Sequence, residues 1–140
     1  MIELQCSCAC QATTVKLALS QPISDHQPRR CDCDFCTERS IVYLSDANGQ
    51  IQILAQASLI NLVQGSEQAH FLKCSSCNTV VAASYSEGDN TIGAVNISLF
   101  NEVHVMKTAV KASPKLLSPT EKTSRWLQLW SPLQVVVKAR

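Results

Sequence analysis

The chain has 140 residues, of which 46% are hydrophobic, 16% are charged and eight are cysteine. This length fits one domain, and the apolar content is sufficient for a packed core, which excludes wholesale disorder. No stretch is long and apolar enough to cross a bilayer, and the residues after Met1 do not resemble a secretory signal. We therefore expect a single cytoplasmic domain over residues 1–140 without a membrane partner.

The net charge of +1 conceals an uneven distribution of charge along the chain. Residues 1–104 carry five basic and ten acidic side chains, whereas residues 105–140 carry seven basic side chains and one acidic one. We expect a core over about 2–104 and a basic C-terminal segment that attracts either this core or an acidic partner. The lack of aromatic residues interleaved with the basic ones disfavours nucleic-acid binding.

The first half of the chain has the patterns of short strands. Apolar and polar residues alternate over 13–19, which predicts a strand on a half-buried sheet. The proline-containing segment 21–28 is expected to be a loop. Residues 41–44 and 51–54 predict two strands, and the turn residues at 46–49 indicate that the two form a hairpin.

Strand patterns continue to about residue 104. Segments 59–63 and 69–73 predict a strand on each side of a turn, and segments 80–85 and 91–99 predict two more. The sequence up to this point is therefore typical of a mainly β domain.

The C-terminal segment contains one clear helix signal. Ser118-Pro119-Thr120-Glu121 is a capping box with proline at the first helical position, so we expect a helix over about 119–130. Trp126 and Trp130 lie one turn apart on this helix, and we expect them to pack it onto the sheet. Residues 133–137 predict a final strand at a sheet edge.

The eight cysteines occur in three clusters with the short spacing of metal chelates. In a reducing compartment, clustered thiols bind metal or do redox work more often than they form disulfides. Soft thiolate ligands favour zinc, and four thiolates form the common structural site. The first cluster is Cys6, Cys8 and Cys10, the second is Cys31, Cys33 and Cys36, and the third is Cys74 and Cys77.

One Cys-x-Cys pair and the distant Cys74-x-x-Cys77 pair supply the four ligands of a closed zinc site. The first cluster offers two equivalent pairs. We prefer Cys8 with Cys10, because this choice leads directly into the strand at 13–19 and leaves Cys6 as a spare thiol.

The middle cluster then has three ligands and an open fourth position, which is typical of a catalytic or substrate-binding zinc. Two alternatives remain open for Cys31, Cys33 and Cys36: a fourth ligand from His26, His70 or Cys6 closes the site, or the three thiols carry no metal. The histidines, including His104, are isolated in the sequence and are expected to be structural or exposed.

The order and spacing of the clusters resemble those of the glutathione-dependent formaldehyde-activating enzymes and their relatives, which include centromere protein V. Cys8-Ala9-Cys10-Gln11-Ala12 is similar to the family's Cys-x-Cys-Gly-Ala opening, and Cys31-Asp32-Cys33-Asp34-Phe35-Cys36 to its Cys-x-Cys-x-x-Cys run. Cys74-Ser75-Ser76-Cys77 stands in place of its Cys-x-x-Cys-Gly motif, and Val95-Asn96-Ile97-Ser98-Leu99 is similar to a following strand. The resemblance covers about residues 2–102.

This resemblance implies a mainly β fold, namely a zinc-stabilised β-tent of antiparallel sheets with, in this chain, one short C-terminal helix. It implies a structural zinc on Cys8, Cys10, Cys74 and Cys77, and an active-site zinc on Cys31, Cys33 and Cys36. The implied activity is that of a carbon–sulfur lyase of the S-(hydroxymethyl)glutathione synthase type, which binds a small thiol such as glutathione. The alternative is a noncatalytic zinc-binding module for a protein or an acidic partner.

Two departures from the family pattern lead to structural expectations. Gln11 and Asn78 stand in place of glycines, so two tight turns there have to be made by residues that tolerate a positive φ less well.

The charge of the middle site leads to a further expectation. Three thiolates on a divalent ion leave a negative charge, which repels an anionic tripeptide unless Arg29, Arg30 or Arg39 points into the cleft.

Overall fold

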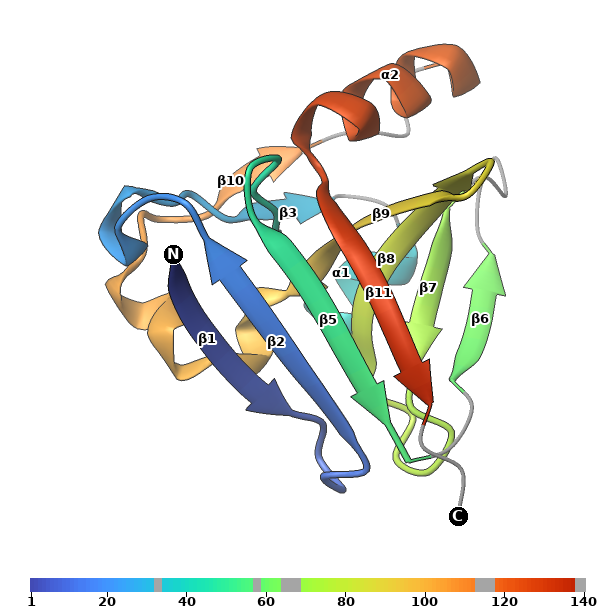
Figure 1. The fold of residues 1–140 in the computed structure, drawn as a ribbon. Helices are drawn as coiled ribbons and strands as arrows, with labels where there is room; N and C mark the ends of the chain where they lie inside the picture. Colours follow the sequence, from blue (N-terminus) through green and yellow to red (C-terminus); the bar gives the residue numbers. More distant parts are fainter. Residues whose placement is uncertain (32–33, 57–58, 64–68, 113–117, 138–140) are drawn as a thin grey trace.

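A computed structural model describes residues 1–31, 34–56, 59–63, 69–112 and 118–137, with the backbone alone at positions 31, 34, 35 and 112. Within these ranges the fold is mainly β, with one helix longer than two turns near the C-terminus (Figure 1). The strands are β1 (Ile2–Ser7), β2 (Thr13–Leu19), β3 (Arg29–Cys31), β4 (Val42–Leu44), β5 (Gln50–Ala55), β6 (Ile60–Val63), β7 (His70–Lys73), β8 (Val80–Glu87), β9 (Asn90–Asn96), β10 (Val110–Ala112) and β11 (Ser131–Val137). The helices are α1 (Asp34–Arg39), α2 (Pro119–Leu129) and the 3-10 turns η1 (Ile23–Asp25), η2 (Ile97–Leu99) and η3 (Asn101–Val105).

The first layer of the fold contains four strands in the order β1-β2-β5-β11. β2 is antiparallel to both β1 and β5, whereas β11 runs parallel to β5. Side chains of β2 alternate between the core and the outer face, as the apolar-polar alternation predicts. Figure 1 shows these four strands side by side at the front of the molecule.

The second layer is built around β9. One edge of β9 pairs with β8, which continues to β7 and β6, while its other edge pairs with β4, followed by β3 and β10. The first residues of β11, Ser131 and Pro132, pair with Gly93 and Ile92 of β9, so β11 connects the two layers. Most of the paired strands are antiparallel; the β3–β10 and β5–β11 pairs are parallel.

The main core lies between the two layers. Leu17 and Ile53 come from the first layer and Val81 and Val95 from the second, and all four are fully buried in one cluster. A second, smaller cluster lies around Cys36 of α1, with side chains from β4, β8 and β9 packed against it. The two cores explain why both faces of β8 are apolar at its start.

The C-terminal helix forms as the capping box predicts. The Ser118 side chain accepts a hydrogen bond from the Glu121 backbone N–H, and the Glu121 side chain accepts one from the Ser118 N–H. Trp126 is buried against Tyr85 of β8, with ring centroids 5.5 Å apart, and stacks on Trp130 at 4.9 Å. The prediction that the two tryptophans pack this helix onto the sheet is confirmed.

The strand pairing corrects two predictions. The strands at 41–44 and 51–54 do not form a hairpin, because β4 pairs with β3 and β9 in one layer while β5 pairs with β2 and β11 in the other. The turn between them carries the chain from one layer to the other. The final strand does not lie at an edge either, since β11 lies between β5 and β9.

Three further elements differ from those expected from the sequence. The strand expected over 91–99 ends at Asn96, whose side chain accepts a hydrogen bond from the Ser98 N–H and begins η2. The short helix α1 contains Cys36, the last cysteine of the middle cluster, in a region expected to be β. The edge strand β1, which contains Cys6, was not predicted from the sequence.

Candidate metal centre

The turn between β1 and β2 holds the first cysteine pair in a compact backbone conformation. The Cys8 N–H donates to the Thr13 carbonyl at 2.9 Å, and the Gln11 N–H donates back to the Cys8 carbonyl at 3.0 Å. Gln11 has a φ of 65°, the left-handed conformation that lets the chain reverse immediately after Cys10. The turn therefore places both thiols on its inner side.

The turn between β7 and β8 repeats this arrangement for the second pair. The Cys74 N–H donates to the Thr79 carbonyl at 2.9 Å, and the Asn78 N–H donates to the Cys74 carbonyl at 2.9 Å. Asn78 has a φ of 62° directly after Cys77. Glutamine and asparagine thus adopt the positive φ expected at these two places, and asparagine tolerates that conformation best among non-glycine residues.

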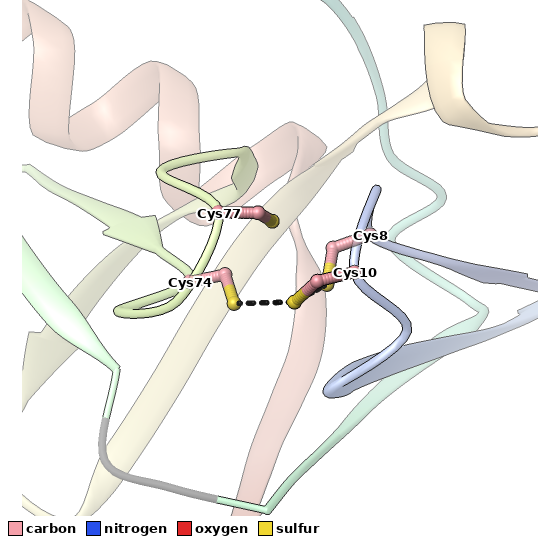
Figure 2. A group of neighbouring side chains, drawn as sticks. All are labelled: Cys8, Cys10, Cys74 and Cys77. Carbon is pink, nitrogen blue, oxygen red and sulfur yellow. Dashed lines mark hydrogen bonds between the residues drawn. The ribbon is translucent and has the colours of Figure 1, made fainter.

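The two turns meet because their strands belong to layers that pack face to face. Both turns lie at the same end of the molecule, and Figure 2 shows their four thiols directed toward one another. The sulfur atoms of Cys8, Cys10, Cys74 and Cys77 all lie within 4.8 Å of one another. The structure therefore brings together the four cysteines that the spacing argument grouped.

The geometry of the four sulfurs fits a tetrahedral metal ion. The Cys8–Cys10 and Cys10–Cys74 sulfur pairs are each 3.7 Å apart. Four sulfurs about 2.3 Å from a central zinc stand about 3.8 Å from one another in a regular tetrahedron. Since the widest pair needs to close by only about 1 Å, the group can hold one metal ion with small side-chain movements.

Hydrogen bonds prepare part of the cluster to bind a cation. The Thr79 hydroxyl lies 3.0 Å from the Cys77 sulfur, and this contact lowers the pKa of Cys77 to about 5. Burial raises the pKa of Cys74, but the backbone N–H groups of Cys77 and Ser76 outweigh it and lower the pKa below the ordinary thiol value. Cys77 is thus ionised at neutral pH without any metal, and the pKa of Cys74 is shifted in the same direction.

The exposed thiol of Cys10 behaves in the opposite way. The backbone N–H of Ala12 lowers its pKa, but burial and the neighbouring sulfurs of Cys77, Cys8 and Cys74 raise it to about 11. Cys10 therefore keeps its proton in the metal-free cluster. A metal ion that binds all four sulfurs has to displace this proton.

Cys6 lies outside the four-sulfur group. It is half-buried on β1 opposite Val15, and burial raises its pKa to about 12. The thiol packs against the main core rather than turning toward Cys74 and Cys77. This position agrees with the choice of Cys8 and Cys10 as the converging pair.

The middle cysteine cluster is described only in part. Cys31 ends β3, but its side chain, like the whole of Cys33, lies outside the described residues. Cys36 is buried on α1, and its sulfur lies 3.2 Å from the Tyr43 hydroxyl. Tyr43 was not anticipated from the sequence as a partner of Cys36. The signal that could have found it is its position on a predicted strand shortly after the cluster.

An open cavity of about 540 Å³ lies beside Cys36, at the junction of α1, β3, β4 and β10. Its apolar wall comes from Ile41 and Val42, and its basic wall from Arg30 and Lys111. Of the three arginines considered in the sequence, Arg30 is the one that lines this cavity. Arg29 instead donates a hydrogen bond to Ser45, and burial lowers its pKa.

The histidines take no part in the four-cysteine group. His70 and His104 are exposed, and His26 lies in a surface turn with a ring nitrogen 3.3 Å from the Gln21 carbonyl. Among the described residues, the only group of metal-ligating side chains gathered around one point is the set of four cysteines.

Comparison with known proteins identifies the fold and no activity. No family model matches the chain, and no curated protein matches it. A crystal structure of a Rhodobacter sphaeroides protein, a structural-genomics target, has a similar fold. The two chains are 21% identical with a TM-score of 0.55, over 76% of this chain and 99% of the other. At this identity the likeness concerns the fold alone.

No helix in the described part of the chain is both long and apolar enough to cross a bilayer.

Proposed function

We propose that this protein is a zinc enzyme of the carbon–sulfur lyase type, with one structural zinc and one open zinc that binds a small thiol such as glutathione. The structural ion is assigned to Cys8, Cys10, Cys74 and Cys77. The open ion is assigned to Cys31, Cys33 and Cys36. The observation that carries this proposal is the convergence of the two outer cysteine pairs, which uses four thiols and leaves the middle three for a separate site.

The surroundings of Cys36 support a ligand-binding role for the middle cluster. The Tyr43 hydroxyl lies within hydrogen-bond reach of the buried Cys36 sulfur, and a hydroxyl at this place can support a sulfur ligand from outside the metal's own shell. The cavity beside this residue offers about 540 Å³, which is room for a small molecule. By contrast, the four-cysteine group has all its thiols directed inward and offers no vacant ligand position once an ion is bound.

The proposed chemistry is the reversible addition of a thiol to formaldehyde. A bound zinc would lower the pKa of the ligand thiol and hold its sulfur as a thiolate. The sulfur lone pair forms a bond to the aldehyde carbon, the carbonyl π pair moves to oxygen, and that oxygen takes up one proton. The product is a hydroxymethyl thioether, and the reverse reaction breaks the same carbon–sulfur bond. The apolar wall of Ile41 and Val42 limits water around the reacting carbon.

Metal analysis combined with an exchange measurement tests the proposal. We expect about two zinc ions per chain, and a faster exchange of formaldehyde between its free and glutathione-bound forms than in buffer. The exchange rate at equilibrium is the right readout, since thiol addition to formaldehyde proceeds readily without a catalyst. Magnetisation-transfer NMR with labelled formaldehyde measures it directly.

Two variants separate the roles of the sites. Cys36→Ser is expected to leave about one zinc per chain and to abolish the exchange enhancement, while the thermal transition is retained. Cys74→Ser is expected to remove the structural ion and to lower the thermal transition. One zinc per chain and no exchange enhancement in the wild type would contradict the enzyme and favour the noncatalytic zinc-binding module.

A further inference from the structure

Two basic residues on neighbouring strands line the cavity beside Cys36. β10 runs parallel to β3, and Lys111 is the register partner of Arg30. Because partners in neighbouring strands direct their side chains to the same face of a sheet, the two basic side chains leave the sheet from adjacent positions on one face. Both line the cavity, and both are exposed to solvent.

The other described residues of the cavity lining are neutral. Ile41 is buried and Val42 half-buried, and together they form the apolar part of the wall. Thr37 and Ser40 contribute hydroxyl groups from the end of α1 and the turn that follows it. The described lining thus combines two adjacent cations with an apolar surface, on the same side as the buried thiol of Cys36.

We propose that Arg30 and Lys111 bind a carboxylate of the ligand, so that this site selects small thiols that carry a carboxylate. The proposal rests on the function assigned above, since it places the sulfur of the ligand toward Cys36 and its carboxylate toward the two cations. It names the specificity-determining residues of that site, neither of which belongs to a cysteine cluster.

Electrostatics explains why such a pair is needed. A divalent ion with three protein thiolates carries a net charge of −1, and the thiolate of the ligand adds another negative charge. A carboxylate on the same ligand would be repelled further unless cations stood within a few ångströms of it. Arginine offers a planar fork of N–H donors that matches a carboxylate, and lysine adds a second point charge.

The lining favours a carboxylate over a phosphate. Phosphate dianions are usually held by several converging backbone N–H groups at a turn or a helix start. The described lining supplies instead two side-chain cations, two hydroxyls and an apolar wall. This set suits a singly charged group attached to an aliphatic chain.

The test compares ligands that differ in one group, with the zinc-loaded full chain. Mercaptopropionate carries both a thiol and a carboxylate, mercaptopropanol lacks the carboxylate, and methylthiopropionate lacks the free thiol. Isothermal titration calorimetry at low ionic strength measures their affinities. We expect mercaptopropionate to bind about tenfold more tightly than mercaptopropanol, as one charge-assisted contact provides. We also expect this preference to shrink with added salt.

The variants Arg30→Gln and Lys111→Gln, and the two combined, assign the preference to its residues. Each single change is expected to weaken mercaptopropionate binding several-fold, and the double variant to bind the acid and the alcohol equally. The matched control is Lys16→Gln, which removes one positive charge from an exposed position on β2 in the other layer. It is expected to leave both affinities unchanged, and all variants are expected to retain the wild-type thermal transition and zinc content.

Three results would overturn the inference: equal affinities of the wild type for the acid and the alcohol, a preference that survives in the double variant, or competition by inorganic phosphate stronger than by acetate.

Methylthiopropionate distinguishes failure of the carboxylate site from failure of the proposed function. If it binds in a manner that depends on Arg30 and Lys111 while the thiols show no dependence on Cys36, the carboxylate site stands and the enzyme assignment is wrong. If both thiols bind equally and depend on Cys36, the function stands and this inference is wrong.

Discussion

The sulfur atoms of Cys10 and Cys74 lie 3.7 Å apart although 64 residues separate them along the chain. This contact joins the turn after β1 in one layer to the turn after β7 in the other. An ion shared by the two turns closes a long loop and restricts the unfolded chain. The cluster therefore ties the two layers together at one end, whereas β11 connects them at the other.

Loss of one ligand from this cluster should release the metal and destabilise the fold. We expect Cys74→Ser to bind one zinc fewer than the wild type and to unfold at a temperature lower by about 10 °C, because folding and structural metal binding are coupled. Cys6→Ser is the matched control, since it removes a half-buried thiol from the adjoining strand but not from the four-sulfur group. Zinc content and calorimetry measure the outcome. Loss of zinc in Cys6→Ser with retention in Cys10→Ser would mean that Cys6 and Cys8 are the ligands.

The order in which the thiols react should follow their ionisation rather than their exposure. Metal-free protein treated with iodoacetamide near pH 6.5 is expected to be alkylated first at Cys77, whose pKa is lowered to about 5, and later at the exposed Cys10, whose pKa is raised to about 11. Peptide mass spectrometry identifies the modified residue. Initial modification of Cys10 would contradict the assignment.

The Thr79 hydroxyl is the first cause of this order. Thr79→Val removes the donor to the Cys77 sulfur, so the pKa of Cys77 should rise. Its alkylation at pH 6.5 should slow by about tenfold for each unit by which the pKa exceeds 6.5. Because its pKa is lower in the folded chain, this thiolate stabilises the metal-free fold above the pKa of an unfolded thiol. The contribution is lost as the pH falls toward 5. Without metal, the variant and the wild type should therefore have the same free energy of unfolding at acidic pH. Above about pH 9 the variant should be the less stable protein.

A second pH dependence should arise from Asp46, in the turn between β4 and β5. Burial raises its pKa, but the backbone N–H and hydroxyl of Ser20, at 2.8 and 2.6 Å, and the backbone N–H of Asn48 outweigh it and lower the pKa below the usual range. The ionised carboxylate therefore stabilises the fold above the unfolded pKa of about 3.9, and this contribution is lost as the pH falls further.

We expect Asp46→Asn to cost about 1 kcal/mol near neutral pH, since hydrogen bonds to a charged acceptor are stronger than those to an amide. The difference from the wild type should close below about pH 3. Urea unfolding at a series of pH values measures it. Asp89→Asn, an exposed position in the turn after β8, is the control and should show no such trend. An Asp46→Asn difference that is constant with pH would contradict the ionic explanation.

Local elements of this fold were predictable from the sequence because their causes are local. The capping box at Ser118 specifies where α2 begins, and the alternation over 13–19 specifies which face of β2 is buried. The convergence of the outer cysteine pairs was predictable for a different reason. Two thiols at chelate spacing need two more to complete a closed site, and the Cys74–Cys77 pair is the only other isolated pair in the sequence.

Strand partners were not predictable, because no local pattern encodes them. The turn at 46–49 resembles a hairpin turn, yet Ser131 anchors it to the start of β11: the Ser131 hydroxyl donates to the Asp46 carbonyl at 2.7 Å and lies 2.8 Å from the Asp46 backbone nitrogen. This contact spans 85 residues. It holds the chain where it leaves one layer for the other, so β4 and β5 separate. Similarly, the basic wall of the cavity depends on the pairing of β3 with β10, two short strands far apart in sequence.

Gly93 should not be replaceable by a larger residue without loss of stability. It lies in β9 between Ser84 of β8 and Ser131 of β11, where a Cβ atom would overlap the Ala83 carbonyl oxygen and the Leu133 side chain. The carbonyl belongs to a paired strand and cannot move aside, so the strands would have to separate at the point where the two layers connect. We expect Gly93→Ala to cost about 1–3 kcal/mol and to lower the thermal transition by several degrees.

Two further variants isolate the steric cause. Leu133→Ala combined with Gly93→Ala should recover part of the loss caused by Gly93→Ala, because it removes one of the two overlaps, and a double-mutant cycle measures the recovery. Gly88→Asn is the control. Gly88 has a φ of 61° with open space around the missing Cβ, and asparagine tolerates this conformation, so the change should cost less than 1 kcal/mol. A Gly93→Ala protein as stable as the wild type would show that β9 and β11 do not approach as closely as the structure has them.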